Sequence, residues 1–173
     1  MAEQTNGKAR EKVGPLHQTS MDLAPDVREQ MITLLNQQLA NTADLYSQSK
    51  QAHWNVKGIY FEELHVLFDK VADTIFPYVD ALAERATALG GTAKGTIRMG
   101  AAASELPEMP LELAKGEDFL AAMTDRWAHY AASVRAAVQE SDDAGDLTTS
   151  DLLLEVSHDA DKMLWFIEAH LQD

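Results

Sequence analysis

The 173-residue chain contains no cysteine, which excludes disulfides, thiolate metal sites and a cysteine nucleophile. Any bound metal would therefore need carboxylate and imidazole ligands, which suit harder or borderline ions such as iron, manganese and zinc. Basic residues are also scarce, because 14 Lys and Arg stand against 28 Asp and Glu, for a net charge of −14. A body this acidic would repel a phosphate polymer, so its composition argues against a nucleic-acid surface.

Long apolar runs are missing as well. No stretch approaches the roughly 18 apolar residues of a membrane span, and residues 1–14 lack the apolar core of a secretory signal. We therefore expect a cytoplasmic protein without membrane contact. The chain has only five prolines and nine glycines, and most of them fall in residues 1–25 and 90–116. This distribution predicts a flexible N-terminal tail over 1–24 and one domain over 25–173 with an internal linker.

Four long stretches repeat apolar residues at intervals of three or four, which is typical of amphipathic helices. They cover about residues 26–54, 61–89, 117–140 and 149–171, and no stretch alternates like a strand. The first and last pairs have short connections, whereas a linker with room for a short helix joins the middle pair. One long crossover predicts an all-α, ferritin-like four-helix bundle, although length alone leaves other bundles open.

The second helix carries an unusual row of acids. His65, Asp69, Asp73, Asp80 and Glu84 face away from its apolar stripe. The simplest alternative is a solvated acidic face. However, His65 with Asp69, and Asp80 with Glu84, are spaced i, i+4, so each pair can reach a single ion.

The two pairs cannot hold the same ion within one chain. Asp69 and Asp80 are about 16 Å apart along the helix axis, because each residue rises by about 1.5 Å. If two copies pack these faces together antiparallel, His65 and Asp69 of one chain meet Asp80 and Glu84 of the other. His53, at the end of the first helix, could join the His65 half. The spacing therefore predicts two equivalent metal sites between subunits.

The competing hypothesis is an intrachain di-iron site, which needs a Glu-x-x-His motif on two helices and inward carboxylates on the other two. The sequence contains Glu62-x-x-His65 and Glu155-x-x-His158. However, His158 projects away from the apolar stripe of its helix, and the first and third helices have no inward carboxylate. We therefore reject the intrachain site.

Several sequence motifs follow one another along the chain. They are Gln51-Ala52-His53-Trp54-Asn55-Val56-Lys57-Gly58, His65 with Asp69, Asp80-Ala81-Leu82-Ala83-Glu84-Arg85-Ala86, Leu106-Pro107-Glu108-Met109-Pro110-Leu111 and Asp161-Lys162-Met163-Leu164-Trp165-Phe166-Ile167-Glu168-Ala169. Over about residues 15–173 the chain resembles the Dps mini-ferritins, the DNA-protecting proteins of starved bacterial cells.

The resemblance implies a hollow homo-oligomeric shell, a dodecamer with 23 (tetrahedral) symmetry. It implies a ferroxidase that oxidises Fe(II), preferably with hydrogen peroxide, and stores Fe(III) mineral, which protects DNA from oxidative damage. Iron would be bound by His53, His65 and Asp69 of one subunit and by Asp80 and Glu84 of its partner. Zinc could occupy the same ligands.

The resemblance also implies roles for residues outside this ligand set. Trp54, next to a ligand, could take up a stray oxidising equivalent, and plain packing is the alternative. Asp146, Asp151 and Glu155 would line an iron-uptake pore on the three-fold axis, where negative potential draws in Fe(II). A solvated turn with Asp caps is the alternative for these acids.

Two further features concern the tail and the second helix. In some relatives a lysine-rich tail binds DNA, so an alternative function is nucleoid binding and compaction through Lys8, Arg10 and Lys12, which Glu3 and Glu11 oppose.

Pro77 departs from the expected pattern, because a proline inside a helix removes one backbone hydrogen bond. We expect a bend there that could shift Asp80.

Overall fold

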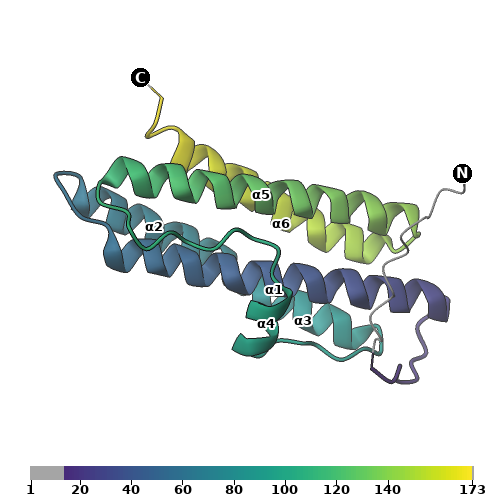
Figure 1. The fold of residues 1–173 in the computed structure, drawn as a ribbon. Helices are drawn as coiled ribbons and strands as arrows, with labels where there is room; N and C mark the ends of the chain where they lie inside the picture. Colours follow the sequence, from purple (N-terminus) through teal and green to yellow (C-terminus); the bar gives the residue numbers. More distant parts are fainter. Residues whose placement is uncertain (1–13, 173) are drawn as a thin grey trace, which may run out of the picture.

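The computed structural model describes residues 14–172, and these form α-helices joined by loops (Figure 1). The helices are α1 (Pro25–Asn55), α2 (Phe61–Ile75), α3 (Pro77–Ala88), α4 (Ile97–Ala103), α5 (Gly116–Asp143) and α6 (Leu147–Glu168). No described helix is both long enough and apolar enough to cross a membrane. The all-α prediction is confirmed, with α4 as the short helix of the linker.

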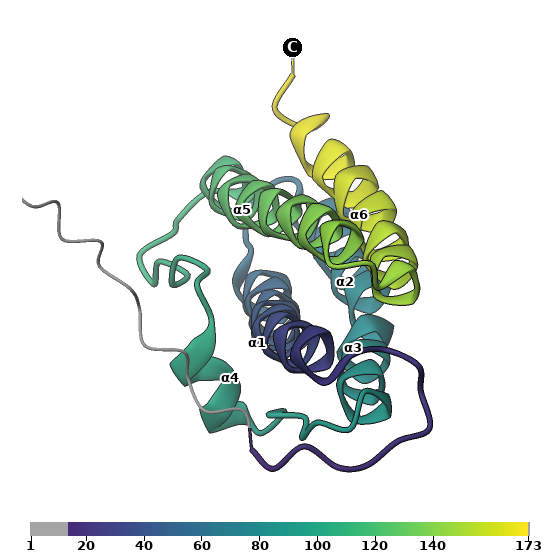
Figure 2. The same cartoon turned by 90° about the vertical axis from the view of Figure 1, so that its right-hand side faces the viewer.

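Viewed along its axis, the bundle places α1, the α2–α3 pair, α5 and α6 around a common interior, while α4 lies outside against α1 (Figure 2). One core cluster lies among α1, α2, α5 and α6 and includes the fully buried Phe68, Trp127 and Tyr130. A second cluster, towards the other end, includes Leu35, Leu82 and Leu153. The apolar periodicity of the sequence thus predicted the buried faces, because burial of an apolar stripe is what stabilises such helices.

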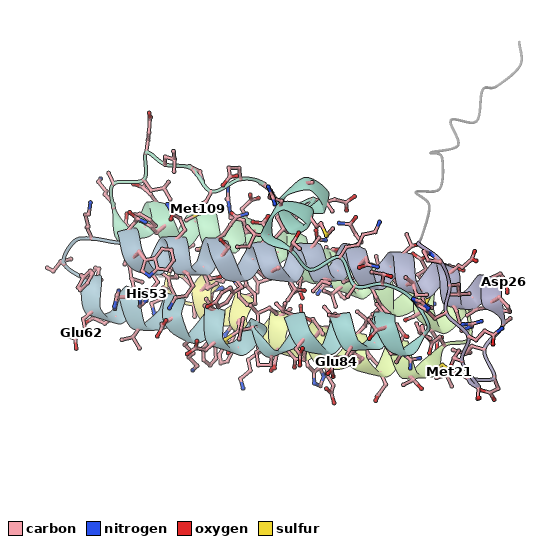
Figure 3. All side chains as sticks on the ribbon, turned by 90° about the horizontal axis from the view of Figure 1, so that it is seen from below. Met21, Asp26, His53, Glu62, Glu84 and Met109 are labelled. Atoms are coloured by element: carbon pink, nitrogen blue, oxygen red, sulfur yellow. The ribbon has the colours of Figure 1, made fainter. Side chains whose placement is uncertain are left out.

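Pro77 divides the predicted second helix into α2 and α3 at Phe76. Phe76 nevertheless keeps α-helical angles, φ −57° and ψ −42°, and α3 continues the direction of α2 (Figure 3). Proline fits here because the first position of a helix needs no intrahelical N–H bond. The interruption is local, and the outer faces of α2 and α3 remain on the same side of the molecule.

The observed ends of the other helices differ from the predicted ones by a few residues. Helix α6 begins at Leu147 because the Asp146 carboxylate accepts a hydrogen bond from the Thr149 N–H at 3.0 Å, which is an N-cap. Helix α3 ends as predicted before Gly90, which has φ +91°. A Cβ at Gly90 would lie only 2.6 Å from the carbonyl oxygen of His17. Glycine is therefore required both for the turn and for this close approach.

Part of the predicted tail packs on the bundle. The His17 N–H donates to the Gly90 carbonyl at 2.8 Å, and Leu16, Met21 and Leu23 pack against the second core cluster. Ordered contacts thus begin ahead of the predicted boundary at residue 24. The tail residues predicted for DNA binding, Lys8, Arg10 and Lys12, lie outside the described residues.

Candidate metal centre

The structure brings together one half of the predicted ligand set where α1 ends and α2 begins. The imidazole rings of His53 and His65 stack with their centroids 3.7 Å apart. His53 comes from the last turn of α1 and His65 from the second turn of α2, and the short loop between them folds α2 back along α1. We call His53, His65 and Asp69 the α1–α2 half-site.

Reciprocal hydrogen bonds orient the two rings. The Nδ1 atom of His53 lies 2.8 Å from the His65 carbonyl oxygen, and the Nδ1 atom of His65 lies 2.9 Å from the His53 carbonyl oxygen. Because a carbonyl only accepts, both Nδ1 atoms must carry the proton. In the neutral rings both Nε2 atoms then keep a free lone pair for a metal, which is how backbone carbonyls commonly orient histidine ligands.

Asp69 lies one turn beyond His65, with its Oδ1 atom 3.8 Å from the His53 Nδ1. It also accepts a hydrogen bond from the Lys50 ammonium. This bond lowers the pKa of Asp69 and raises the pKa of Lys50. The Asp69 carboxylate is therefore held in the anionic form, with a cation already beside it.

Sequence reasoning missed Lys50, although a signal was present. Lys50 precedes His53 by three residues on α1, so both project towards the same side of the helix. Its contact with Asp69 depends on how closely α1 and α2 pack, and helical spacing alone does not give that distance.

Asp80 and Glu84 are both exposed on α3, one turn apart, and we call them the α3 half-site. It lies farther along the α2–α3 direction than His53, so the two half-sites of one chain are well separated (Figure 3). Within residues 14–172 no three His, Asp or Glu side chains gather closely enough to hold an ion. The two half-sites of one chain therefore do not form a single site.

The alternative intrachain site finds no support in the bundle interior. Glu62, Glu155 and His158 are all exposed. Among the described residues, the buried polar and charged side chains include Asp146 as the only carboxylate. Asp146 lies at the start of α6, far in sequence from the His53–His65 pair.

The other predicted residues are placed as follows. Trp54 is 66% exposed beside His53, and its indole therefore does not pack in the core of a single chain. Asp151 and Glu155 are exposed, one turn apart on α6. Asp146 is instead 2% exposed, and its Oδ1 atom accepts a hydrogen bond from Arg85 at 2.7 Å. Its carboxylate thus caps α6, as the Asp-cap alternative allowed, and is buried against Arg85, a contact that the sequence did not predict.

The outer face that carries both half-sites is also partly apolar. Phe61, Val66 and Phe76 on or beside α2 are 46%, 59% and 54% exposed. At about 100° per residue they lie among His65, Asp69 and Asp80 around the helix. This face therefore offers apolar as well as polar side chains to a contact with another chain.

Comparison with known proteins identifies the family of the chain. Residues 32–173 match the ferritin family, described as the ferritin-like domain. The chain is 40% identical to the DNA protection during starvation protein of Agrobacterium fabrum, over 91% of this chain and 97% of that protein. It also resembles the structure of DpsC from Streptomyces coelicolor, with a TM-score of 0.87 and 29% identity. The match covers 96% of this chain and 97% of that one. An archaeal Dps homologue from Halobacterium salinarum has a TM-score of 0.86 at 28% identity, covering 98% of this chain and 94% of that one.

Proposed function

Because the chain belongs to the Dps family of ferritin-like proteins, we propose that it is a ferroxidase that works between subunits and stores iron. The observation that carries this proposal is the division of the ligands into two half-sites on one outer face. In a two-fold pair of chains, each α1–α2 half-site would meet the partner's α3 half-site. Imidazole and carboxylate ligands suit Fe(II), the substrate.

The exposed apolar residues support the two-fold pairing. Phe61, Val66 and Phe76 would be covered by the second copy, which would stabilise the contact by removing apolar surface from water. The same contact would bury Asp69 together with Asp80 and Glu84 of the partner subunit. Burying several carboxylates together is costly unless their charge is neutralised, and Fe(II) would add positive charge to that of Lys50.

The proposed reaction transfers one electron from each of two Fe(II) ions to one molecule of hydrogen peroxide. The O–O bond breaks, two protons are taken up, and two water molecules and two Fe(III) ions result. The Nδ1–H bonds of His53 and His65 keep both Nε2 atoms available throughout. Lys50 would give up or share the Asp69 carboxylate when the metal binds. Zinc accepts the same ligand types and would compete with iron.

The family relationship supports a homo-oligomeric shell, and we propose a dodecamer with Fe(III) mineral inside. Asp151 and Glu155, exposed one turn apart on α6, would attract Fe(II) to an uptake pore. Removal of Fe(II) and peroxide together would limit hydroxyl-radical formation. In this proposal DNA is protected by that removal, and DNA binding is not required.

The proposal is tested by peroxide-dependent Fe(II) oxidation in the double variant Asp80→Ala/Glu84→Ala. We expect oxidation to slow by at least about 100-fold, since two of the five proposed ligands are lost. Size-exclusion chromatography must show the same assembly as for the unchanged protein. An assembled double variant with unchanged oxidation kinetics would refute the site assignment.

A further inference from the structure

Helix α3 carries two proposed iron ligands and packs mainly against α1. Its buried residues are Leu82 and Ala86. Pro77 also removes one of the backbone hydrogen bonds that would otherwise join α3 to α2. The direction of α3, and with it the positions of Asp80 and Glu84, must therefore depend on contacts with other helices.

Two side chains of α3 make hydrogen bonds that join it to α6. The Tyr78 hydroxyl donates to the Asp159 carboxylate at 2.8 Å. At the other end of α3, Arg85 donates from Nη2 to Asp146 at 2.7 Å and from Nε to Thr149 at 2.9 Å. We call these contacts the α3–α6 ties.

The tie at Arg85 is well shielded from water. The side chains of Arg85 and Asp146 are 13% and 2% exposed, and Thr149 is fully buried. Asp146 also caps α6 through the Thr149 N–H. A shielded, charge-assisted network of this kind is geometrically specific, because each donor has a fixed acceptor.

Arg85 and Tyr78 lie beside the α3 half-site in sequence, and they point away from it towards α6. Arg85 directly follows Glu84, and Tyr78 precedes Asp80 by two residues. A rotation or shift of α3 that broke either tie would also move both carboxylates. The ties therefore fix the register of the exposed ligands from the opposite side of the helix.

We propose that Arg85 and Tyr78 are positioning residues for the α3 half-site, and that Asp146 acts as the anchor for Arg85 and does not contribute an iron-uptake ligand. This inference rests on the proposed inter-subunit site. It separates Asp146 from Asp151 and Glu155, although all three are acids at the same end of α6. Asp146 serves to hold α3, whereas the other two remain exposed to ions.

The test uses the assembled, full-length protein and the variants Arg85→Gln, Arg85→Lys and Tyr78→Phe. Tyr78→Phe removes a single hydroxyl and is the variant least able to disturb folding. Arg135→Gln is the matched control, because it breaks an Arg–Asp pair with Asp161 that joins α5 to α6 and leaves α3 untouched. Hydrogen exchange of residues 77–88 reports on α3 without any metal.

We expect exchange in α3 to become about tenfold faster in Arg85→Gln, with smaller increases in Arg85→Lys and Tyr78→Phe. Anaerobic titration with Co(II), followed by its visible absorption, should show affinity lowered on the order of tenfold and an altered spectrum in Arg85→Gln. Arg135→Gln should match the unchanged protein in both measurements. Asp146→Asn should weaken Co(II) binding as Arg85→Gln does, whereas Asp151→Asn should leave it intact.

Unchanged α3 exchange in all three variants would overturn the inference. So would faster exchange with unchanged Co(II) affinity and spectrum, because the ties would then serve stability alone. Asp146→Asn with normal Co(II) binding and slower iron uptake would return Asp146 to the pore. By contrast, Co(II) binding to the unchanged protein that Glu84→Gln does not weaken would refute the proposed metal site itself.

Discussion

The α1–α2 half-site holds its proposed ligands where two helices pack together, whereas the α3 half-site presents its proposed ligands on an exposed face. His53 and His65 orient each other through their rings and backbone carbonyls, and Asp69 has Lys50 as a partner. Asp80 and Glu84 depend on the position of a short helix that is tied to α6 from behind. Local contacts therefore organise one half, and the rest of the bundle organises the other.

The largest expected effect comes from the core beneath the α1–α2 half-site. Phe68 is fully buried in the first cluster, on the inner side of α2. Phe68→Ala should lower the free energy of unfolding by about 3–5 kcal/mol, because it removes a large apolar side chain and leaves a cavity. Guanidinium chloride unfolding at a fixed protein concentration measures this loss. A loss below about 1 kcal/mol would mean that this core does not support the half-site.

Removal of one ring from the stacked pair should have the next largest effect. His53→Ala takes away a ligand and the partner against which His65 stacks. We expect Fe(II) oxidation to fall on the order of 100-fold, equivalent to about 2.7 kcal/mol. Stopped-flow absorbance of Fe(III) formation measures it. His129→Ala, which alters an exposed histidine on α5, is the control and should oxidise iron normally.

Helical spacing predicted the four bundle helices and the outward placement of the proposed ligands, because both follow from a period of about 3.6 residues. It did not predict the contact of Lys50 with Asp69, which joins two helices across 19 residues, or that of Arg85 with Asp146, across 61 residues. The family resemblance implied that Asp146 lines a pore, with an Asp cap as the alternative. Its carboxylate is instead buried beside Arg85. That contact depends on how α3 packs against the start of α6, which the spacing of residues along one helix does not give.

A smaller effect should follow from the loss of the cation beside Asp69. Lys50→Met removes a positive charge that competes with the metal for this carboxylate. We expect Co(II) affinity to rise about two- to fivefold, in line with the about 0.5–1 kcal/mol of a partly exposed ion pair. Isothermal titration calorimetry measures the change. Weaker binding in Lys50→Met would instead mean that Lys50 orients Asp69 for the metal.

The smallest effect concerns the α3–α6 ties at alkaline pH. Burial and the hydrogen bond to Asp159 raise the pKa of Tyr78 above its usual value. The stability that the neutral phenol contributes is thus complete below about pH 10, and it declines as the pH rises towards the raised folded pKa. Below pH 10 we expect Tyr78→Phe to be about 0.5–1.5 kcal/mol less stable.

The difference in stability between Tyr78→Phe and the unchanged protein should therefore narrow above pH 10. Thermal midpoints between pH 8 and 11 measure it. Burial also raises the pKa of Tyr130. Tyr130 is present in both proteins, so its pH-dependent contribution to stability cancels when the two are compared. A gap that widens with pH would contradict the assigned hydrogen bond.

The central claim, that each site is shared between two chains, is tested most directly by co-assembly of two inactive variants. One carries His53→Ala/His65→Ala, and the other carries Asp80→Ala/Glu84→Ala. In a mixed two-fold pair, the intact α1–α2 half-site of the second variant meets the intact α3 half-site of the first. Random mixing should then restore about a quarter of the sites, and with them about a quarter of the Fe(II) oxidation. Mixed assemblies as inactive as either parent would show that the site is not shared between chains.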